Sequence, residues 1–344
     1  MDERRPNVIQ QVFKIRGMGQ VIIVTGFFIV MTIVFGIMSP NFLSGRNISN
    51  VIRQISPFII AGIGQSYVLI TGNIDLSIGS VVGMSNMIAA TLMSTYGVNP
   101  WLAAAITMVA CIILGVLNGT LVANFKLPPF IATLGTMMVA RGIAQGVNEG
   151  YNTGPIIAPE PLADKAAELA AFKDKADFFK NFFYYGQIGP IFSTLIVALV
   201  LWGFFNFILS RTKTGRHIYA VGSNIEAAKM SGVSVSKTVI TAYVVSAFCA
   251  SVVGFIMTAQ TGQGAMNTGT TYEMYAVAAS VIGGVSTLGG QGILLGTVVG
   301  ACVWAGLANG LSINGSSLAV QNITIGIIVV ISVLSDVLIR QRKK

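Results

Sequence analysis

The stretch VIIVTGFFIVMTIVFGIM, residues 21–38, contains no charged side chain. A helix needs about 20 consecutive, mostly apolar residues to cross the hydrocarbon core of a membrane. A second stretch of this kind, Ile191–Leu209, is also free of charged residues. The first stretch lacks the small-residue cleavage signature of a signal peptide, so we interpret it as a retained membrane helix.

The composition of the whole chain also indicates a membrane protein. Of its 344 residues, 53% are hydrophobic and only 10% are charged, and the mean hydropathy is +0.76. A soluble domain carries roughly a quarter charged residues, so this chain has too little polar surface to cover a water-exposed globule. We expect an all-α, polytopic membrane protein in which residues 1–344 form a single transmembrane domain.

Apolar runs separated by Gly, Pro, Asn or charged residues predict about ten membrane spans. They are residues 21–38, 55–71, 75–93, 102–123, 130–147, 188–210, 238–260, 274–286, 291–311 and 322–339. The eighth span is short. Between the second and the third, Thr71-Gly72-Asn73 predicts a turn or a break, because these residues are unfavourable in a helix interior.

An even number of spans places both termini on the same side of the membrane. Most of the 21 Lys and Arg residues fall on that side, and basic residues favour the cytoplasmic side. They are Arg4, Arg5, Lys14, Arg16, Lys126, Arg211, Lys213, Arg216, Lys229, Lys237, Arg340, Arg342, Lys343 and Lys344. We therefore predict cytoplasmic termini, and we interpret the net charge of +9 as a topology signal and not as a nucleic-acid-binding patch.

Residues 148–187 form the sizeable soluble segment on the opposite side. Apolar residues recur there at the three- and four-residue steps of an amphipathic helix. They are Leu162, Leu169, Phe172, Ala176, Phe179 and Phe183. We favour a helix that lies on the outer membrane surface; a docking surface for a partner protein is the alternative.

The sequence predicts no catalytic residue and no metal site. It has no phosphate-binding Gly-x-x-x-x-Gly-Lys-Ser/Thr stretch, and the single histidine, His217, excludes a histidine cluster. The three cysteines, Cys111, Cys249 and Cys302, lie in apolar runs, where Cys behaves as a small hydrophobic residue. The acids at membrane depth are few: Asp75, Glu273 and Asp336. We expect a transport pathway whose energy source lies in another protein.

The long loop 211–238 predicts a short helix. Asn224 can cap its N-terminus, and Glu226 suits its first turn because an acid there complements the helix dipole. The residues that follow are strong helix formers, and Gly232 can end the helix. Connections between helices usually take about 2–8 residues, so the loop is long for a connector. Composition leaves a partner-docking helix and a plain linker equally open.

Four stretches of the chain resemble, in order, blocks of the ribose/galactoside-type sugar permeases, the membrane subunits of bacterial ABC importers. They are TGNIDLSIGS (71–80), PFIATLGTMMVARGIA (129–144), GRHIYAVGSNIEAAKMSGVSV (215–235) and YEMYAVAASVIGGVSTLGGQG (272–292). The resemblance covers nearly the whole chain. It has two departures: Asn73 stands where the family has Gly, and segment 148–187 is longer and more charged than usual.

This resemblance implies a type II-like ABC importer permease fold in the bacterial inner membrane, and a homodimer surrounded by lipid. It implies two further partners, a cytoplasmic subunit that binds ATP and Mg and an extracytoplasmic sugar-binding protein, so that this chain needs no cofactor. Loop 211–238 is then the coupling helix region, whose small residues would let it enter a groove of the ATPase. The implied coupling residues are Asn224, Glu226, Ala227, Ala228, Lys229 and Gly232.

Polar residues in the spans are candidates for the pathway. We favour Asp75 as an acid that caps the start of the third span, with Asn73 as an alternative cap; a broken helix there would instead turn it toward the pathway. Arg141 can extend outward to the interface or bind a sugar hydroxyl. The neutral candidates are Gln65, Asn86, Asn118, Thr133, Thr136, Gln145 and Gln260. Each suits an interhelical hydrogen bond; together they suit a neutral polyol, which needs amides and hydroxyls and no counter-charge.

We therefore predict the membrane subunit of a binding-protein-dependent ABC importer for a neutral, ribose- or galactose-like monosaccharide. The alternatives are a secondary carrier of a small polar solute driven by an ion gradient, and a channel or scaffold protein. The scarcity of carboxyl groups at membrane depth disfavours the carrier, and a channel would leave the predicted helix 224–232 without a role. The sugar itself, another polyol or a nucleoside stays open.

Overall fold

The computed structural model describes residues 18–317 and, beyond these, residues 319–321, 323, 324, 326–328, 330, 331 and 334. The described part is mainly helical with almost no strand, as the composition predicts. Its α-helices are α2 (Met18–Met38), α3 (Gly45–Ile70), α4 (Ile78–Ser94), α5 (Pro100–Ala123), α6 (Pro129–Gly146), α7 (Ala166–Lys180), α8 (Ser193–Arg211), α9 (Lys213–Ser223), α10 (Ile225–Met230), α11 (Val235–Thr261), α12 (Tyr272–Ile282) and α13 (Leu294–Ile313). The shorter elements are η1 (Glu160–Leu162), the π-helical turn η2 (Asn181–Tyr185), and strands β1 (Gln187–Ile188) and β2 (Ile191–Phe192).

Five helices, α2, α5, α8, α11 and α13, are long and apolar enough to cross a membrane, judged by length and composition. Helices α3, α4, α6 and α12 coincide in position with the second, third, fifth and eighth predicted spans. The tenth predicted span, residues 322–339, lies largely outside the described residues. So do Asp336 and the basic residues near the chain ends, Arg4, Arg5, Lys14, Arg16, Arg340, Arg342, Lys343 and Lys344. The expectation of ten spans therefore stays a prediction.

Two helices begin away from the predicted positions. Helix α3 begins at Gly45, well before residue 55, because the hydroxyl of Ser44 accepts the backbone N–H of Asn47 at 3.3 Å and caps the helix. Helix α8 begins at Ser193, because the residues before it form an antiparallel hairpin in which Gln187 pairs with Phe192. Short polar caps and turns of this kind do not change the apolar pattern from which spans are predicted.

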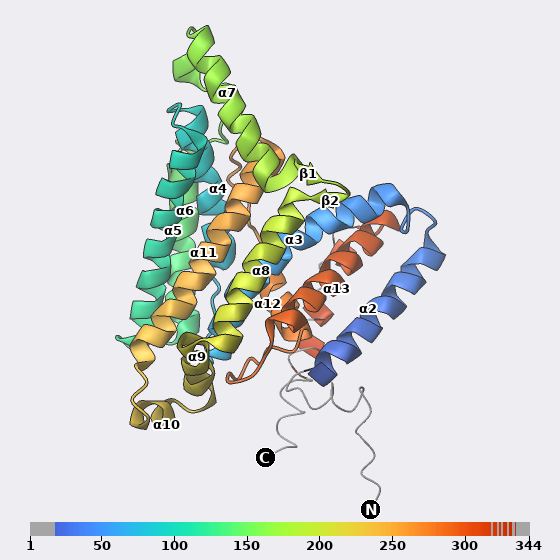
Figure 1. Cartoon of the computed structure of the whole chain (residues 1–344), viewed down its shortest axis with the longest axis vertical. Helices are drawn as coiled ribbons and strands as arrows, with labels where there is room; N and C mark the ends of the chain where they lie inside the picture. The colour runs from blue at the N-terminus through green and yellow to red at the C-terminus, as the bar shows by residue number, and fades with distance from the viewer. Residues whose placement is uncertain are drawn as a thin grey trace, which may run out of the picture.

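Helix α11 lies at the centre of the bundle, where it packs against α3, α4 and α5 (Figure 1). Of its most apolar window 78% is buried, compared with 22% for α2 and α8, which lie at the periphery. Large apolar side chains such as Ile23 and Ile37 of α2 are exposed. In a membrane protein these side chains face lipid, so the exposed apolar surface agrees with the predicted class.

Glycines permit the closest helix contacts. Gly283 at the end of α12 and Gly296 in α13 lie backbone against backbone, and a Cβ atom on either would overlap the carbonyl group of the other. A Cβ atom on Gly300 would likewise overlap the carbonyl oxygen of Ala279. These glycines therefore have the packing role that their spacing predicts.

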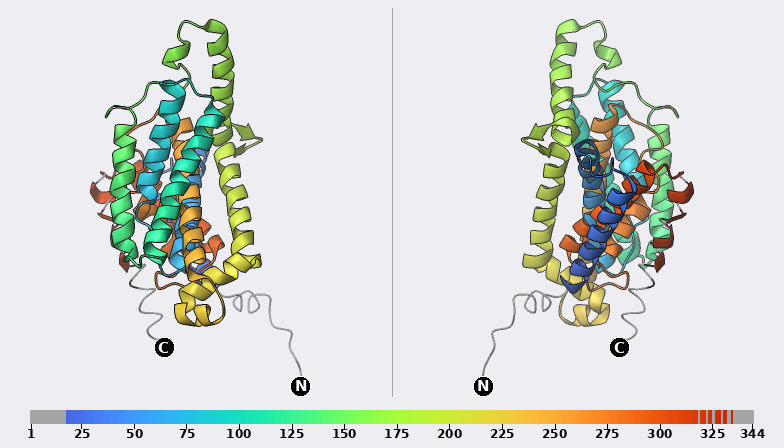
Figure 2. Two further views of the ribbon diagram at one scale, coloured as in Figure 1. Left: turned by 90° about the vertical axis from the view of Figure 1, so that its left-hand side faces the viewer. Right: turned by 90° about the vertical axis from the view of Figure 1, so that its right-hand side faces the viewer.

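Two segments project from opposite ends of the bundle (Figures 1 and 2). We call these ends the α10 end, formed by α9 and α10, and the α7 end, formed by α7 and the β1–β2 hairpin. The described basic residues that were predicted for one side all belong to segments at the α10 end: Lys126, Arg211, Lys213, Arg216, Lys229 and Lys237. The predicted separation of loop 211–238 from segment 148–187 is therefore present.

Helix α7 has the predicted amphipathic pattern but not the predicted orientation. Phe172, Ala176 and Phe179 are buried on the side that faces the bundle. Figure 1 shows α7 rising obliquely beyond the ends of α4, α5 and α6, so it does not lie flat across the bundle end as expected. The cause is a cluster of aromatic rings: Trp101 at the start of α5 contacts Phe179 with 5.7 Å between ring centroids and Phe183 with 6.1 Å. These ring contacts hold the base of α7 upright.

Candidate functional site

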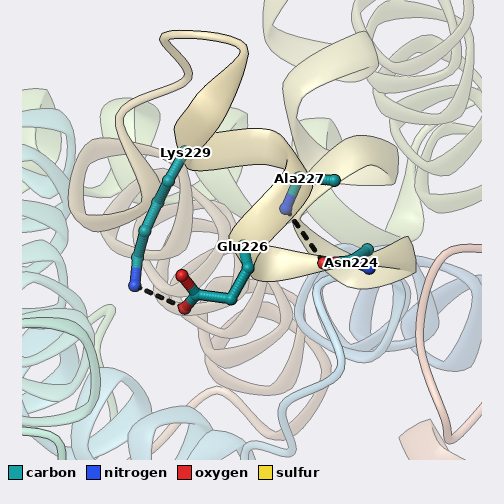
Figure 3. A network of polar contacts seen from close by, with 4 residues as sticks. All are labelled: Asn224, Glu226, Ala227 and Lys229. Atoms are coloured by element: carbon teal, nitrogen blue, oxygen red, sulfur yellow. Dashed lines mark hydrogen bonds and ion pairs between the residues drawn. The ribbon is translucent and has the colours of Figure 1, made fainter.

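Helix α10 is the predicted short helix of loop 211–238 (Figure 3). The side-chain oxygen of Asn224 accepts the backbone N–H of Ala227 at 2.9 Å, which is the expected cap. Lys229 Nζ lies 2.7 Å from Glu226 Oε1. Gly232 follows the helix with φ +76°, a left-handed conformation that favours glycine. The local structure predicted for these residues is present, and their role in coupling stays a prediction.

The burial of the two faces of α10 differs from what its small residues suggested. Ala228 is only 4% exposed and belongs to the core of the chain itself, so it is not free to enter a groove of another protein. On the outer side lie Ala227, Ile225 and Met230, and the last two are 46% and 91% exposed. This burial argues against a direct contact of Ala228 with a partner, and its assignment as a coupling residue stays a prediction. Sequence reasoning missed Met230, an apolar side chain left exposed at the end of a short helix.

Asp75 lies in the non-helical connection between α3 and α4, where the predicted break is present. Its side chain is buried, and both oxygens accept hydrogen bonds. Oδ1 accepts from the backbone N–H of Ser77 at 2.9 Å and from Ser77 Oγ at 2.6 Å, and Oδ2 accepts from Ser246 Oγ of α11 at 2.7 Å. Because a buried carboxyl group is costly unless it is hydrogen-bonded, these donors explain how it is tolerated.

The same connection is tied to two more helices. Asn118 of α5 donates from Nδ2 to Ser77 Oγ at 2.9 Å, and Thr136 of α6 donates to Asn118 Oδ1 at 2.6 Å. Three predicted pathway residues, Asp75, Asn118 and Thr136, thus lie in one hydrogen-bonded network. Ser77 is the N-cap residue of α4, and Asp75 binds Ser77 without capping any N–H inside the helix, so the capping interpretation of Asp75 is not confirmed. The network instead reaches α5, α6 and α11.

Several of the neutral candidates for the pathway form hydrogen bonds with other groups of this chain. Asn73 donates to Thr71 Oγ1 at 2.8 Å and does not cap α4. Thr133 donates to the carbonyl of Pro129 in its own helix at 2.8 Å. Asn86 donates to Thr258 Oγ1 of α11 at 2.9 Å, which confirms an interhelical hydrogen bond.

The remaining neutral candidates lie apart from this network. Gln145 and Gln260 are exposed, near the ends of α6 and α11. Gln65 is fully buried in α3, and neither polar atom of its amide has a hydrogen-bond partner among the described residues. An unpaired buried amide costs free energy, so Gln65 stands out as a group that needs a ligand or water.

Arg141 binds main-chain carbonyl oxygens, which neither of the two interpretations of its role predicted. Its Nη1 donates to the carbonyl oxygens of Met266 at 3.1 Å and Thr268 at 2.9 Å, in the connection between α11 and α12. A Cβ atom on Gly83 of α4 would overlap the Thr268 carbonyl, so this connection lies directly on α4. Arg141 therefore fastens the connection to the bundle, a role that its position in the sequence does not predict.

A hollow of about 310 Å³ lies near the α10 end of the bundle. Its lining comes from the end of α3, the α3–α4 connection, the start of α6 and the α12–α13 turn: Leu69, Gly72, Asn73, Ile74, Pro128, Pro129, Phe130 and Thr287. Gln65 lies one helical turn before Leu69, on the same side of α3. Of the predicted pathway residues, Asn73 thus lines the hollow, and Gln65 lies in the same helix as Leu69 of its wall.

The chain is similar to known permeases along almost its whole length. A family model for the permease component of branched-chain amino acid transport systems matches residues 47–333. The chain is 33% identical over 311 residues to the ribose import permease protein of Haemophilus influenzae, with 90% of each chain covered. It is 35% identical over 320 residues to the D-allose transport system permease protein of Escherichia coli, with 91% of each covered. No solved structure matches the chain.

A third relative, the galactose/methyl galactoside import permease protein of Escherichia coli, is 32% identical, with 93% of this chain and 95% of the relative covered. These similarities confirm the resemblance carried by the four stretches between residues 71 and 292. Together with the apolar helices they support a multi-pass protein of the inner membrane. The chain belongs to the ribose/galactoside-type permease family of bacterial ABC importers.

Proposed function

We propose that this chain is the transmembrane subunit of a binding-protein-dependent importer that moves a neutral monosaccharide into the cytoplasm. A partner subunit binds ATP and Mg and hydrolyses the ATP, and an extracytoplasmic protein delivers the sugar. The chain forms a homodimer of ten-span subunits with the type II-like fold, and its α10 end faces the cytoplasm. The import of ribose, allose and galactosides that the names of its relatives state supports this substrate class.

The observation that best supports a partner at the α10 end is that one side of α10 is buried in this chain while the other side is exposed. The helix is anchored on one side by the buried Ala228, its start is capped by Asn224, and on the other side it leaves Met230 almost fully exposed. An exposed apolar side chain on a well-anchored helix suits burial against another protein. The basic residues at this end support its cytoplasmic placement.

The hollow near the α10 end is our candidate for the inner mouth of the pathway. Most of its lining residues are apolar, Asn73 and Thr287 are polar, and none of the described residues that line it is charged. Such a surface suits a neutral polyol, because hydroxyls bind amides and carbonyls without a counter-charge. Gln65, one helical turn before Leu69, has an amide without a hydrogen-bond partner among the described residues, and this amide offers donors and an acceptor for the sugar or for water.

A second copy of the chain would complete this mouth. Phe130, at the start of α6, lines the hollow and has an exposed side chain. On the same helix, a Cβ atom on Gly135 or Gly142 would meet no atom of the described residues within 4 Å. Two residues seven positions apart lie on one side of a helix, and small residues there allow another membrane helix to approach closely, so we place the second subunit against α6.

Uptake by reconstituted vesicles tests this function. Sugar uptake should require ATP and both partner proteins, and ionophores should leave it unchanged. Transport by this chain alone, abolished when an ion gradient is collapsed, would replace the importer with a secondary carrier.

Crosslinking tests the docking site with two adjacent residues. A cysteine placed by Ala227→Cys, on the outer side of α10, should crosslink to the ATPase subunit. The neighbouring Ala228→Cys is the matched control, because its side chain is buried within this chain and should not crosslink. Equal crosslinking from both positions would contradict the assigned docking face.

A further inference from the structure

Helix α9 is wedged between two segments of the bundle, and its closest contacts with them are made by main-chain atoms. A Cβ atom on Gly222 would overlap the carbonyl oxygen of Ile70, the last residue of α3, and would lie 2.6 Å from the backbone N of Gly290. Gly290 in turn donates its N–H to the Ile70 carbonyl at 2.8 Å. The end of α9, the end of α3 and the α12–α13 turn therefore meet backbone to backbone.

A second contact fixes α9 to the same turn. The hydroxyl of Tyr219 donates to the carbonyl of Gly292 at 2.6 Å. Gly289 packs against both α9 and the α3–α4 connection. A Cβ atom there would lie 2.8 Å from Cα of Gly72 and from the carbonyl oxygen of Gly222. We call the contacts of Tyr219 and Gly222 with Ile70 and residues 289–292 the α9 joint. Contacts between main chains cannot be relieved by a change of rotamer, so displacement of α9 must displace its neighbours.

The two segments held at the α9 joint also form walls of the hollow. The hollow is lined by Leu69, Gly72 and Asn73 from the end of α3 and its continuation, and by Thr287 from the α12–α13 turn. Each of these residues lies within three positions of a residue of the joint. A shift of α9 would therefore move both walls together.

Helix α10 is connected rigidly to α9. Asn224 is the single residue between them, and its backbone N–H donates to Ala220 of α9 at 3.1 Å while its side chain caps α10. The buried Ala228 fixes the inner side of α10. The two helices should thus respond to a push on α10 as one body.

We propose that the α9 joint transmits movement of α10 to the walls of the hollow, and that Tyr219 and Gly222 position those walls in response to the ATPase. This inference rests on the proposed function, because it takes α10 as the docking helix and the hollow as the inner mouth. In it α9 is the mechanical link between the two sites, and neither Tyr219 nor Gly222 touches the sugar.

The test removes one bond of the joint and leaves the backbone intact. Tyr219→Phe deletes the hydroxyl that binds Gly292, and Tyr185→Phe is the matched control, because it deletes a hydroxyl that donates to the carbonyl of Gln260 at 2.9 Å at the α7 end. Both are introduced into the assembled complex of permease, ATPase and binding protein. The ATP hydrolysed per sugar imported should rise about fivefold in Tyr219→Phe, the factor expected for the net loss of one hydrogen bond, and stay unchanged in the control.

A label in the hollow separates transmission from a loss of stability. Thr287→Cys is introduced into a chain with Cys302→Ala, since Cys111 and Cys249 are buried. Its reaction with a thiol reagent should change when ATP is trapped on the complex. In Tyr219→Phe that change should shrink, while the ATPase still crosslinks to Ala227→Cys. An unaltered ATP-to-sugar ratio with a full nucleotide-dependent change in labelling would overturn the inference. Uptake that needs no ATP in the parent complex would instead overturn the proposed function.

Discussion

Helices α10 and α7 both project from the bundle, but they are attached to it in different ways. Helix α10 is joined through α9 to main-chain atoms of Ile70 and Gly290, with glycines at the points of contact. Helix α7 is attached through aromatic rings around Trp101, whose centroids lie between 5.4 and 6.1 Å from those of four phenylalanines. Each helix also has an exposed ion pair three residues apart, Glu226–Lys229 and Lys165–Glu168.

This difference shows how each end can respond to force. Main-chain contacts between glycines are specific and leave no space to adjust, so they suit the transmission of a displacement. Ring contacts bury a large apolar area but allow small rotations, so they suit the support of a surface without rigid coupling to the bundle. The exposed ion pairs contribute little in either place. The variants below test whether the two ends differ in this way, in order of decreasing expected effect.

The largest effect is expected at the α9 joint. Gly222→Ala places a methyl group where the carbonyl oxygen of Ile70 lies, and no side chain can move aside to relieve the overlap. Overpacking of this kind typically lowers the unfolding free energy by about 1–3 kcal/mol. The loss should lie in the upper part of that range here, because the neighbour is main chain. Sugar uptake should be abolished, as measured in vesicles with matched permease content. Gly203→Ala in α8, where a Cβ atom meets nothing within 4 Å, should transport normally; an equal loss in both variants would contradict the special role of the joint.

A large effect is also expected at the inner face of α10. Ala228→Trp forces a large ring into the core of the chain and should lower the thermal stability of the purified permease, by about 1–3 kcal/mol or more in unfolding free energy. Ala227→Trp, on the outer face, should leave that stability unchanged and weaken ATPase binding. If the two variants have the opposite pattern, the assignment of inner and outer faces of α10 is wrong.

A moderate effect is expected at the base of α7. Trp101→Ala removes the ring that four phenylalanines contact, and because Trp101 is partly exposed the cost should be about 2 kcal/mol, below the range for a fully buried Trp. Limited proteolysis should then cleave segment 148–187 faster, while the ATPase still crosslinks to Ala227→Cys. Loss of that crosslink would show that the two ends are not independent.

Deletion of Ala163–Lys180 separates the two interpretations of α7. Insertion and ATPase binding should be retained because the segment lies at the opposite end from α10. If α7 helps to dock the binding protein, uptake should fall mainly at low binding-protein concentration. Equal uptake at every concentration would leave α7 without a docking role.

The smallest effect is expected from the exposed ion pairs. Glu226→Lys and Glu168→Lys each reverse one charge of a pair, and exposed pairs contribute about 0.2–1 kcal/mol. Stability should change within that range in both variants. Uptake should fall slightly in Glu226→Lys and not in Glu168→Lys at saturating binding protein. A severe defect in Glu226→Lys would indicate that charge, and not shape, determines docking at α10.

Much of the fold could be predicted because it depends on local patterns. Apolar length predicts helices such as α2 and α11, and a Gly-Asn pair after Thr71 predicts the break between α3 and α4. The α10 helix could be predicted down to its Asn224 cap, because caps and i,i+3 pairs involve residues close in sequence. The orientation of α7 could not, because it depends on Trp101, which lies far from α7 along the chain.

In the candidate site, too, local features could be predicted and contacts between distant residues could not. The sequence identifies Asp75, Asn118 and Thr136 as polar residues at membrane depth, but not that hydrogen bonds through Ser77 link the α3–α4 connection to α5 and α6. It identifies Arg141 as an unusual charge, but the carbonyls that it binds lie more than a hundred residues further on. It also suggests that Ala228 is exposed, because a small residue in a short helix has no periodicity long enough to define its buried side.

By itself the sequence determined the class of the protein, most of its long apolar helices, the break at Thr71–Asn73 and the short capped helix 224–232, but not α9, which precedes it in loop 211–238. These depend on hydropathy and on bonds within one turn of the chain. Only the tertiary structure decided that Gly222 touches Ile70 and Gly290, that the hollow forms beside them, and that Met230 rather than Ala228 faces outward. The physical reason is that close packing joins residues far apart in the chain, and such contacts depend on shape, which no local pattern of residues records.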